Sequence, residues 1–239
     1  MSAGKLDRWF WVVAVASVAI SGLLVVCLFE PVSAKPPIGS WSTPVQISSS
    51  KCESGEMWQD NLYVYGTAYG QANLSTSYNN GVSWNPEIAF DGRIDVVGYV
   101  LHRVGFGTVS GTLQYSRSTD NGTSWTGPVV VMTNTGHDWF YDIEMVENVL
   151  VVFGWSSEGI EVTKSIDGGT TWSPQQLADR EVTMDDPRQN DIVYFDGKLY
   201  ITYSNYTVLP YPNDSEIVLI ESSDLGETWG GRRTIGYGS

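Results

Sequence analysis

One eight-residue pattern recurs four times along this chain, and it constrains the fold more than any other feature of the sequence. Each copy reads Ser, any residue, Asp or Asn, any residue, Gly, any residue, Ser or Thr, and Trp. The four copies are residues 77–84, 118–125, 165–172 and 222–229. Their closing tryptophans are 41, 47 and 57 positions apart, a spacing that suits one four-stranded sheet for each copy.

Each fixed position of this octapeptide has a physical reason in a tight turn. Asp or Asn can accept backbone N–H bonds from the residues that follow it. Gly supplies the positive φ that a tight hairpin needs. The Ser or Thr hydroxyl can tie the ends of the turn together, and the flat Trp can fill the seam between neighbouring sheets. Four copies at this spacing predict a repeated β-sheet unit.

The octapeptide is the Asp-box pattern, and the chain resembles the sialidase-like β-propellers that carry bacterial neuraminidase repeats. The resemblance covers about residues 36–239, although only the four octapeptides are specific. In that family the box joins the third and fourth strands of a blade at the periphery, away from the catalytic centre. The resemblance therefore implies structural roles for these residues: Asp120, Asp167, Asp224, Trp84, Trp125, Trp172 and Trp229. A calcium-binding turn is an alternative, but the ligand-rich spacing of an EF-type loop is missing, so no metal is expected.

The segments around the octapeptides are typical of strands, because they alternate between apolar and polar residues or run apolar. We predict an all-β fold, a β-propeller of four-stranded antiparallel blades. The expected strands are 86–90, 94–101, 103–109, 112–118, 128–132, 141–146, 149–155, 160–165, 174–177, 192–195, 198–204, 216–222 and 233–237. Residues 39–47, which include Trp41, look like the tail of a fifth copy with its outer strand. Four blades are fewer than the six of the sialidase family, so we expect an incomplete ring or a truncated copy of a longer protein.

The first 34 residues have the composition of a targeting segment. Lys5 and Arg8 precede an uncharged run, Phe10–Phe29, and small residues follow at Val32–Ala34. These are the parts of a secretory signal, but the run is also long enough to cross a bilayer as an apolar helix. A cleaved signal and an uncleaved membrane anchor through residues 10–29 both stay open. Either one predicts that residues 35–239 form a domain outside the cytoplasm.

Charge and cysteine content exclude several classes of partner. The chain has 13 basic and 27 acidic residues, a net charge of −14, which repels the phosphates of nucleic acids. Its cysteines are Cys27, inside the apolar run, and Cys52, so the domain has no internal disulfide framework. No P-loop, nucleophile elbow or Cys-based metal motif is present, and no cofactor is expected.

By resemblance to the family, a functional site would lie on the propeller axis, where the innermost strand of each blade begins. The candidate catalytic residues there are Arg93, Asp186 and Arg188. The candidate binding residues are Trp58, Asp95, His137, Asp138, Trp139 and Asp185. Each has a structural alternative: an Asp-Asp-Pro run is often a capped loop, and a lone His beside aromatics is often a hydrogen-bonded core residue.

Three functions fit these residues. A sialidase needs three arginines that clamp a carboxylate, a Tyr nucleophile activated by a Glu, and an Asp acid/base. The family's R-I-P motif is missing, Arg93-Ile94-Asp95 being the nearest string, and a third arginine was not found. These departures favour a propeller that binds a glycan or an extracellular protein. Exo-sialidase activity and a purely structural surface module are the alternatives.

Overall fold

The structure, a computed structural model, describes residues 51–59, 61–68, 71–90, 92–135, 140–180, 190–206 and 215–238. Within these ranges the chain is all-β and forms four antiparallel sheets of four strands each, which confirms the predicted fold class. The apolar run at 10–29 and the strand expected at 39–47 lie outside the described residues. No helix in the described part of the chain has the length and hydropathy needed to cross a membrane.

Each sheet contains four strands that follow one another in the sequence and pair in that order. Sheet 1 contains β1 (Lys51–Trp58), β2 (Asn61–Ala68), β3 (Gln71–Ser77) and β4 (Ile88–Ala89). Sheet 2 contains β5 (Arg93–Val97), β6 (Val100–Phe106), β7 (Thr112–Ser118) and β8 (Val129–Thr133). Sheet 3 contains β9 (Tyr141–Val146), β10 (Val149–Ser156), β11 (Gly159–Ser165) and β12 (Gln176–Asp179). Sheet 4 contains β13 (Asn190–Phe195), β14 (Lys198–Tyr206), β15 (Ser215–Ser222) and β16 (Gly230–Gly238).

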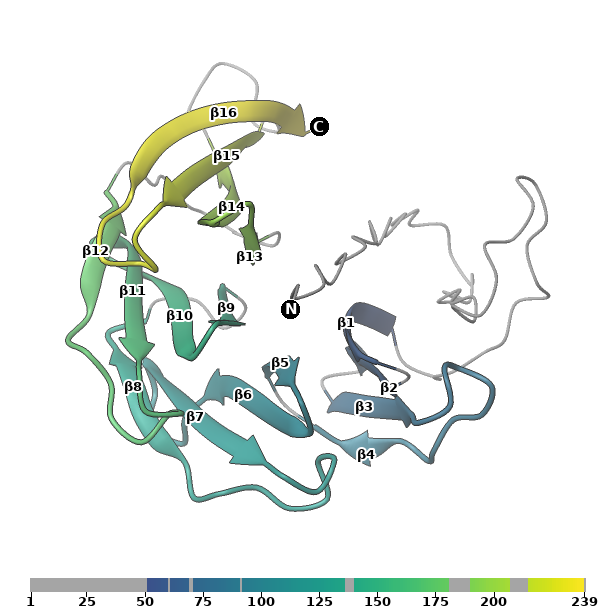
Figure 1. The fold of residues 1–239 in the computed structure, drawn as a ribbon. Coiled ribbons are helices and arrows are strands. Elements are labelled where there is room, and N and C mark those ends of the chain that lie inside the picture. The colour runs from purple at the N-terminus through teal and green to yellow at the C-terminus, as the bar shows by residue number, and fades with distance from the viewer. Residues whose placement is uncertain are drawn as a thin grey trace, which may run out of the picture.

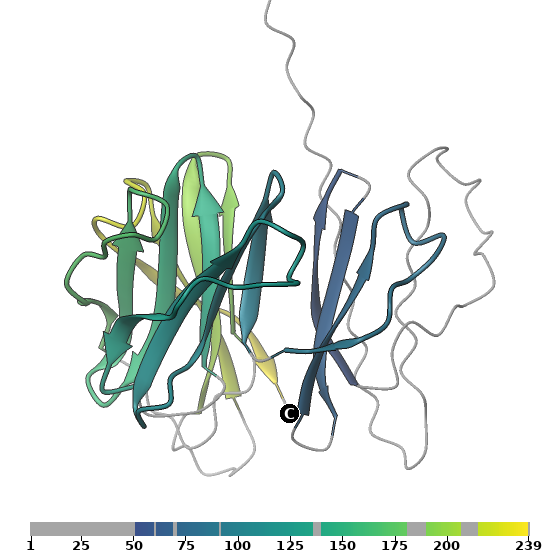
Figure 2. The same cartoon turned by 90° about the horizontal axis from the view of Figure 1, so that it is seen from below.

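The four sheets are arranged radially along an arc (Figure 1). The first strand of every sheet, β1, β5, β9 or β13, lies innermost, and the last, β4, β8, β12 or β16, lies outermost. The innermost strands of successive sheets contact one another in chain order. Figure 2 shows the same sheets from below, standing side by side around the axis with the twist expected of antiparallel sheets.

A two-residue turn joins the first two strands of sheets 2, 3 and 4. In sheet 4 this is Asp196-Gly197, with φ values of 48° and 81°, as the Asp-Gly pair predicts. In sheet 2 the predicted boundary was wrong. The strand was expected to continue through 94–101, but Gly98 takes a φ of 66° and the chain reverses there. Consequently His102 lies inside β6, where its Nδ1 is 2.8 Å from the Tyr115 hydroxyl.

The hydrophobic core is divided among the three interfaces between successive sheets. Side chains of sheets 1 and 2 make one cluster, those of sheets 2 and 3 a second, and those of sheets 3 and 4 the third. Residues at their centres, such as Leu74, Leu150 and Leu199, have no exposed surface. Burial of one such side chain stabilises the fold by about 1.5–3 kcal/mol, so the sheets are held together mainly by these interfaces.

Within each octapeptide, the first Ser and the Asp or Asn form a closed hydrogen-bond network. In the second copy, the Ser118 hydroxyl donates to Asp120 at 2.7 Å and accepts the Gly122 N–H at 2.8 Å. Asp120 also accepts the Ser124 N–H at 2.8 Å and its hydroxyl at 2.5 Å. These bonds lower the pKa of Asp120 to about 2, and the equivalent bonds do the same for Asp167 and Asp224.

The fourth and fifth positions of the octapeptide both take positive φ in every copy. The fifth is Gly in each, with values from 79° to 87°, as its sequence predicts. The fourth position holds Asn80, Asn121, Gly168 and Leu225. Two successive left-handed residues reverse the chain tightly enough for the following Trp to reach the neighbouring sheet.

In the second, third and fourth octapeptides, the tryptophan packs on the sheet that precedes its own. Trp125 of sheet 2 packs on the cluster that contains Leu74, with its ring centroid 5.9 Å from that of Phe90. Trp172 of sheet 3 has its ring centroid 5.1 Å from that of Tyr115 in sheet 2. Trp229 of sheet 4 packs on the cluster between sheets 3 and 4. The octapeptides therefore fix how successive sheets are spaced.

Two alanine substitutions separate the backbone role of the octapeptide glycine from its packing role. Gly169 and Gly226 have φ values of 87° and 82°, but a Cβ on Gly169 would lie 2.1 Å from the Tyr115 ring, whereas the nearest atom at Gly226 is at 3.7 Å. Gly226→Ala is expected to lose about 1–2 kcal/mol through its left-handed backbone alone. Gly169→Ala is expected to lose about 1–3 kcal/mol more through overpacking. Denaturant unfolding measures both, and equal losses would contradict the packing of the third octapeptide on Tyr115.

Candidate functional site

Acidic side chains occupy equivalent positions on the innermost strands. The last residue of each of these strands pairs with the first residue of the next strand across the two-residue turn. Two positions before that last residue, sheets 1 to 4 carry Glu56, Asp95, Glu144 and Val193. Two positions earlier again, sheets 3 and 4 carry Asp142 and Asp191. Because side chains alternate along a strand, each pair on one strand lies on one face. We name Glu56, Asp95, Asp142, Glu144 and Asp191 the axial carboxylate cluster.

Two of these carboxylates link the innermost strand of one sheet to that of the next. Asp95 in β5 accepts the backbone N–H of Met145 in β9 through its Oδ2. Glu144 in β9 accepts the backbone N–H of Tyr194 in β13 through its Oε1, at 3.2 Å. The innermost strand is the edge of its sheet, so its outward N–H groups have no strand to pair with. The carboxylates supply the acceptors that these N–H groups need.

Two carboxylates of the cluster, Asp95 and Asp142, also accept the N–H of the residue that follows them. Asp95 Oδ1 accepts the N–H of Val96 at 2.6 Å, and Asp142 Oδ1 accepts that of Ile143 at 2.9 Å. Asp95 and Asp142 are each 8% exposed, Glu56 and Glu144 are half-buried, and Asp191 is exposed. The cluster therefore runs from buried carboxylates to one that is exposed.

Burial makes Glu56, Asp142, Glu144 and Asp191 weaker acids than usual, and repulsion from acidic neighbours adds to this effect for the first three. Burial, together with repulsion from Asp95, raises the pKa of Glu144 to about 9. Burial raises the pKa of Asp142 to about 7, although attraction to Arg93 opposes the shift. The pKa of Glu56 is raised well above its usual value by burial and then by its acidic neighbours. Desolvation also raises the pKa of Asp191, although the residue as a whole is exposed.

At neutral pH the cluster therefore holds protons as well as negative charge. Arg93, the first residue of β5, is the cation that interacts with it, through Asp142 and Asp191. The guanidinium carbon of Arg93 also lies 5.9 Å from the centroid of the Tyr65 ring. Five carboxyl groups in the cluster leave this region acidic, and it can donate and accept hydrogen bonds. No group of three or more His, Cys, Asp or Glu in the described ranges is arranged to hold a metal ion.

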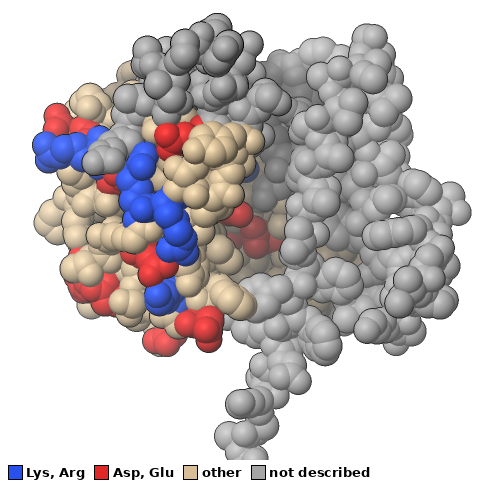
Figure 3. Space-filling model, turned by 90° about the horizontal axis from the view of Figure 1, so that it is seen from above, with Lys and Arg blue, Asp and Glu red and all other residues tan. Residues whose placement is uncertain are grey.

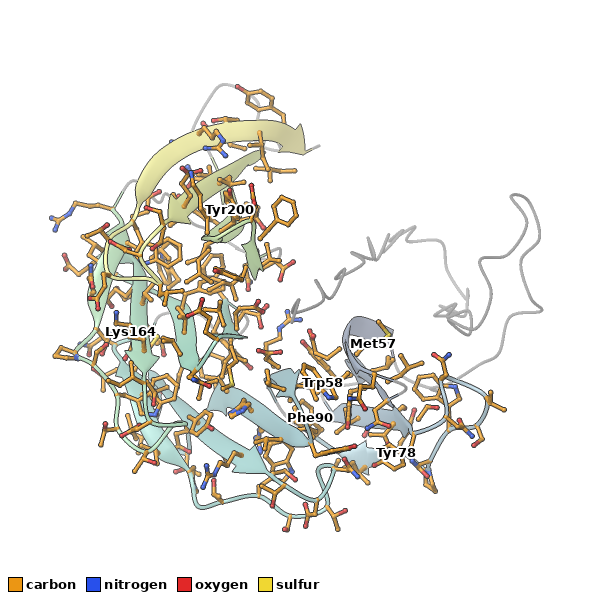
Figure 4. The ribbon with its side chains drawn as sticks, viewed as in Figure 1. Met57, Trp58, Tyr78, Phe90, Lys164 and Tyr200 are labelled. Atoms are coloured by element: carbon orange, nitrogen blue, oxygen red, sulfur yellow. The ribbon has the colours of Figure 1, made fainter. Side chains whose placement is uncertain are left out.

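The structure brings together only part of the predicted site. Arg93 and Asp95 lie on β5 within the axial cluster. Trp58 is the last residue of β1, at the opposite end from the strand start, and packs half-buried against the cluster that contains Phe90 (Figure 4). The remaining candidates lie outside the described residues: His137, Asp138, Trp139, Asp185, Asp186 and Arg188.

Asp142, Glu144 and Asp191 were missed by the sequence analysis, which looked for site residues just before the innermost strands. They lie within these strands, where a carboxylate interrupts an otherwise apolar run. Alignment of the strands by their turns would have revealed them, because Glu56, Asp95 and Glu144 then share one position. A carboxylate that recurs at one position of buried strands is costly unless it has a partner or a function.

Comparison with solved structures finds a similar fold in glycoside hydrolases of the β-propeller type. No family model matches the sequence, and no curated protein matches it. Among solved structures, the GH43 protein BlXynB from Bacillus licheniformis has a TM-score of 0.50 and 11% identity, covering 74% of this chain and 40% of that protein. The xyloglucan-locus protein GH43B of Bacteroides ovatus has a TM-score of 0.52 and 12% identity, covering 78% of this chain and 40% of that one.

The NanB sialidase of Streptococcus pneumoniae is a more distant likeness, with a TM-score of 0.46 and 17% identity over 69% of this chain and 28% of that protein. Its TM-score is too low to support an argument. This chain spans 40% or less of the length of these three proteins. At such identities the likeness concerns the fold alone, and the fold is that of β-propeller glycoside hydrolases.

The axial carboxylate cluster makes stability fall as pH rises. Unfolded Asp and Glu release their protons near pH 4. Asp142 and Glu144 keep theirs up to about pH 7 and 9, so the folded state binds more protons between pH 4 and 9. Their contribution is complete below pH 4 and falls by about 1.4 kcal/mol per pH unit for each extra proton as the pH rises. It is lost by about pH 7 for Asp142 and by about pH 9 for Glu144.

Thermal unfolding between pH 5 and 9 checks this effect. The melting temperature is expected to fall across that range, and Glu144→Gln is expected to flatten the fall because its amide does not titrate. Glu158→Gln, at an exposed turn, should leave the pH profile unchanged. A wild-type melting temperature that stays constant or rises toward pH 9 would show that the cluster is ionised throughout.

Proposed function

We propose that this chain is an exported propeller-type protein that binds a neutral glycan at the axial carboxylate cluster. The observation that carries the proposal is the convergence of acidic side chains from the innermost strands of all four sheets. Carboxylates accept hydrogen bonds from sugar hydroxyls, and each has about four lone-pair positions, of which the backbone N–H groups use one or two. The fold shared with propeller glycoside hydrolases supports a concave glycan site near the axis.

The charge of the cluster favours a neutral glycan over a sialylated one. A sialic acid carries a carboxylate, and binding it beside five acidic groups would require several arginines. Arg93 is the arginine that the described residues bring to the cluster. Exo-sialidase activity would need Arg188 and a third arginine at the same place, and it stays a prediction of the sequence resemblance.

Hydrolysis of a neutral glycoside is a second candidate, favoured by the different proton affinities of Asp142 and Glu144. Glycoside hydrolysis uses one protonated carboxyl group as acid and one ionised group as base or nucleophile. Glu144 has a pKa of about 9 and Asp142 one of about 7. The two residues are two positions apart on β9, which separates their Cα atoms by roughly 7 Å. At neutral pH one donates a proton while the other is partly ionised.

Binding to a glycan array and turnover of aryl glycosides test the proposal on the full chain. Wild type is expected to bind neutral glycans and to bind sialylated ones weakly. Asp191→Asn, at the solvent-facing side of the cluster, should weaken that binding about 10- to 100-fold, because a hydrogen bond to a charged group is lost. Turnover that disappears in Glu144→Gln while binding remains would select the hydrolase.

Asp167→Asn is the matched control, because it removes the same charge from the outer octapeptide of sheet 3. The first octapeptide already uses Asn79 at this position with the same turn, so the variant is expected to fold and to bind like wild type. Equal losses in Asp167→Asn and Asp191→Asn would remove the assignment of the site. An array without neutral-glycan binding, together with no turnover, would leave a protein-binding or structural module.

A further inference from the structure

At each interface between sheets, the octapeptide of the later sheet contacts the earlier sheet at equivalent positions of its strands. On sheet 3 they are Val151, Val162, Lys164 and Gln176, which face sheet 4. Lys164 Nζ lies 2.5 Å from Glu227 of the fourth octapeptide, and the Gln176 side chain donates to the Glu227 carbonyl at 2.6 Å. Val151 faces Gly226 of the same turn. We call these four positions the receiving site of a sheet.

Sheets 1 and 2 use equivalent positions for the octapeptides that follow them. Tyr115 of sheet 2 corresponds to Val162, and its hydroxyl donates to the Gly168 carbonyl of the third octapeptide at 3.2 Å. On sheet 1, Tyr63 corresponds to Val151, and its hydroxyl donates to Asn121 of the second octapeptide at 3.3 Å. Three interfaces built in one way show that the receiving site is a property of the repeat.

Sheet 4 carries a receiving site that no described sheet follows. Its register equivalents are Tyr200, Leu219, Glu221 and Arg233. Tyr200 and Leu219 are half-buried, whereas their counterparts on sheet 3 are 0% and 2% exposed. Glu221 pairs with Lys198 at 2.7 Å and with Arg233 at 3.1 Å. Figure 3, which views the molecule from the side of β15 and β16, shows basic side chains with acidic ones beside them.

The charged residues on this face of sheet 4 do not prevent it from packing against another sheet. The receiving sites of sheets 2 and 3 also contain a cation, Arg117 and Lys164, at the position of Glu221. Lys164 forms its ion pair with the arriving octapeptide and keeps only 15% of its side chain exposed. A charged residue at this position is therefore compatible with docking.

The first octapeptide has no receiving site to pack on among the described residues, because no described sheet precedes it. It keeps the closed turn of the other copies, with the Gly81 N–H at 2.9 Å from the Ser77 hydroxyl. Val82, at the position of Glu227, is 77% exposed. In Figure 1 sheet 1 and sheet 4 occupy opposite ends of the arc, so the first octapeptide does not reach the receiving site of its own sheet 4.

We propose that the receiving site of sheet 4 docks the first octapeptide of a second copy of this chain. The contact continues the interface that already joins sheets 1 to 2, 2 to 3 and 3 to 4. It is heterologous, since different surfaces of the two copies meet, and it associates the arcs head to tail. The net charge of −14 on each copy opposes association, so salt strengthens it by screening.

Cross-linking between two differently tagged full chains tests the contact. One copy carries Val82→Cys and the other Glu221→Cys, and both carry Cys27→Ser and Cys52→Ser. A short bismaleimide is expected to join the two copies. A control pair that replaces Glu221→Cys with Ile166→Cys is not expected to react, because Ile166 is exposed on the octapeptide of sheet 3, away from the receiving site of sheet 4.

Molecular mass in solution, measured on the full chain in a nonionic detergent, gives the second readout. Wild type is expected to associate with rising concentration and more strongly at high salt. Leu219→Asp is expected to keep it monomeric. Val82→Lys should tighten association up to about fivefold, because the lysine can pair with Glu221 of the other copy. Adding Glu221→Lys should cancel that gain. This pair of variants tests the contact even if Leu219→Asp fails to fold.

A chain that stays monomeric up to about 100 μM with no cross-link above the control overturns the proposal. Association that persists unchanged in Leu219→Asp places the interface elsewhere and overturns it as well. Monomers in wild type but dimers in Trp41→Ala would mean that residues 39–47 of the same chain cover the receiving site instead.

Discussion

The contact of an octapeptide tryptophan with the preceding sheet, made in the second, third and fourth copies, is the interaction on which the rest of the structure depends. A four-stranded sheet of this size cannot bury both faces by itself, and its stability comes from its neighbours. Trp125, Trp172 and Trp229 each supply a large flat surface at the outer end of such an interface. The closed hydrogen-bond network of the turn holds the tryptophan in place, so one short motif sets both a local reversal and the angle between sheets.

Radial packing leaves backbone N–H groups at the inner edges of the sheets that need hydrogen-bond acceptors, and the outer turns are too far away to supply them. The innermost strands have N–H groups that face the axis, and Asp95 and Glu144 accept them from the next sheet. Several carboxylates then lie close together, and burial raises their pKa values until some hold protons. The same groups therefore join the sheets and give the axis its chemical character, a combination that is common where a functional site interrupts an otherwise apolar core.

The sequence predicts the repeating units well because each turn is a local structure. The octapeptides, the Asp196-Gly197 turn and the strands of sheet 3 follow from residues that are neighbours in the chain. The early reversal at Gly98 was missed because an apolar run hides it. The carboxylates Asp142 and Glu144 were missed for a different reason: their proximity to Asp95 depends on the alignment of separate sheets, which no local pattern contains.

One substitution within the repeat has a consequence for behaviour in strong acid. The acceptor of the first octapeptide is Asn79, whereas the other three copies use aspartates with pKa values of about 2. A lowered carboxyl pKa stabilises the folded turn at pH values above the pKa of the same carboxyl group in the unfolded chain. That stabilisation disappears as the carboxylate becomes protonated near pH 2. The amide of Asn79 has no proton to gain. Acidification consequently weakens the turns at all three interfaces between the described sheets, and it leaves unchanged only the first turn, which no described sheet precedes.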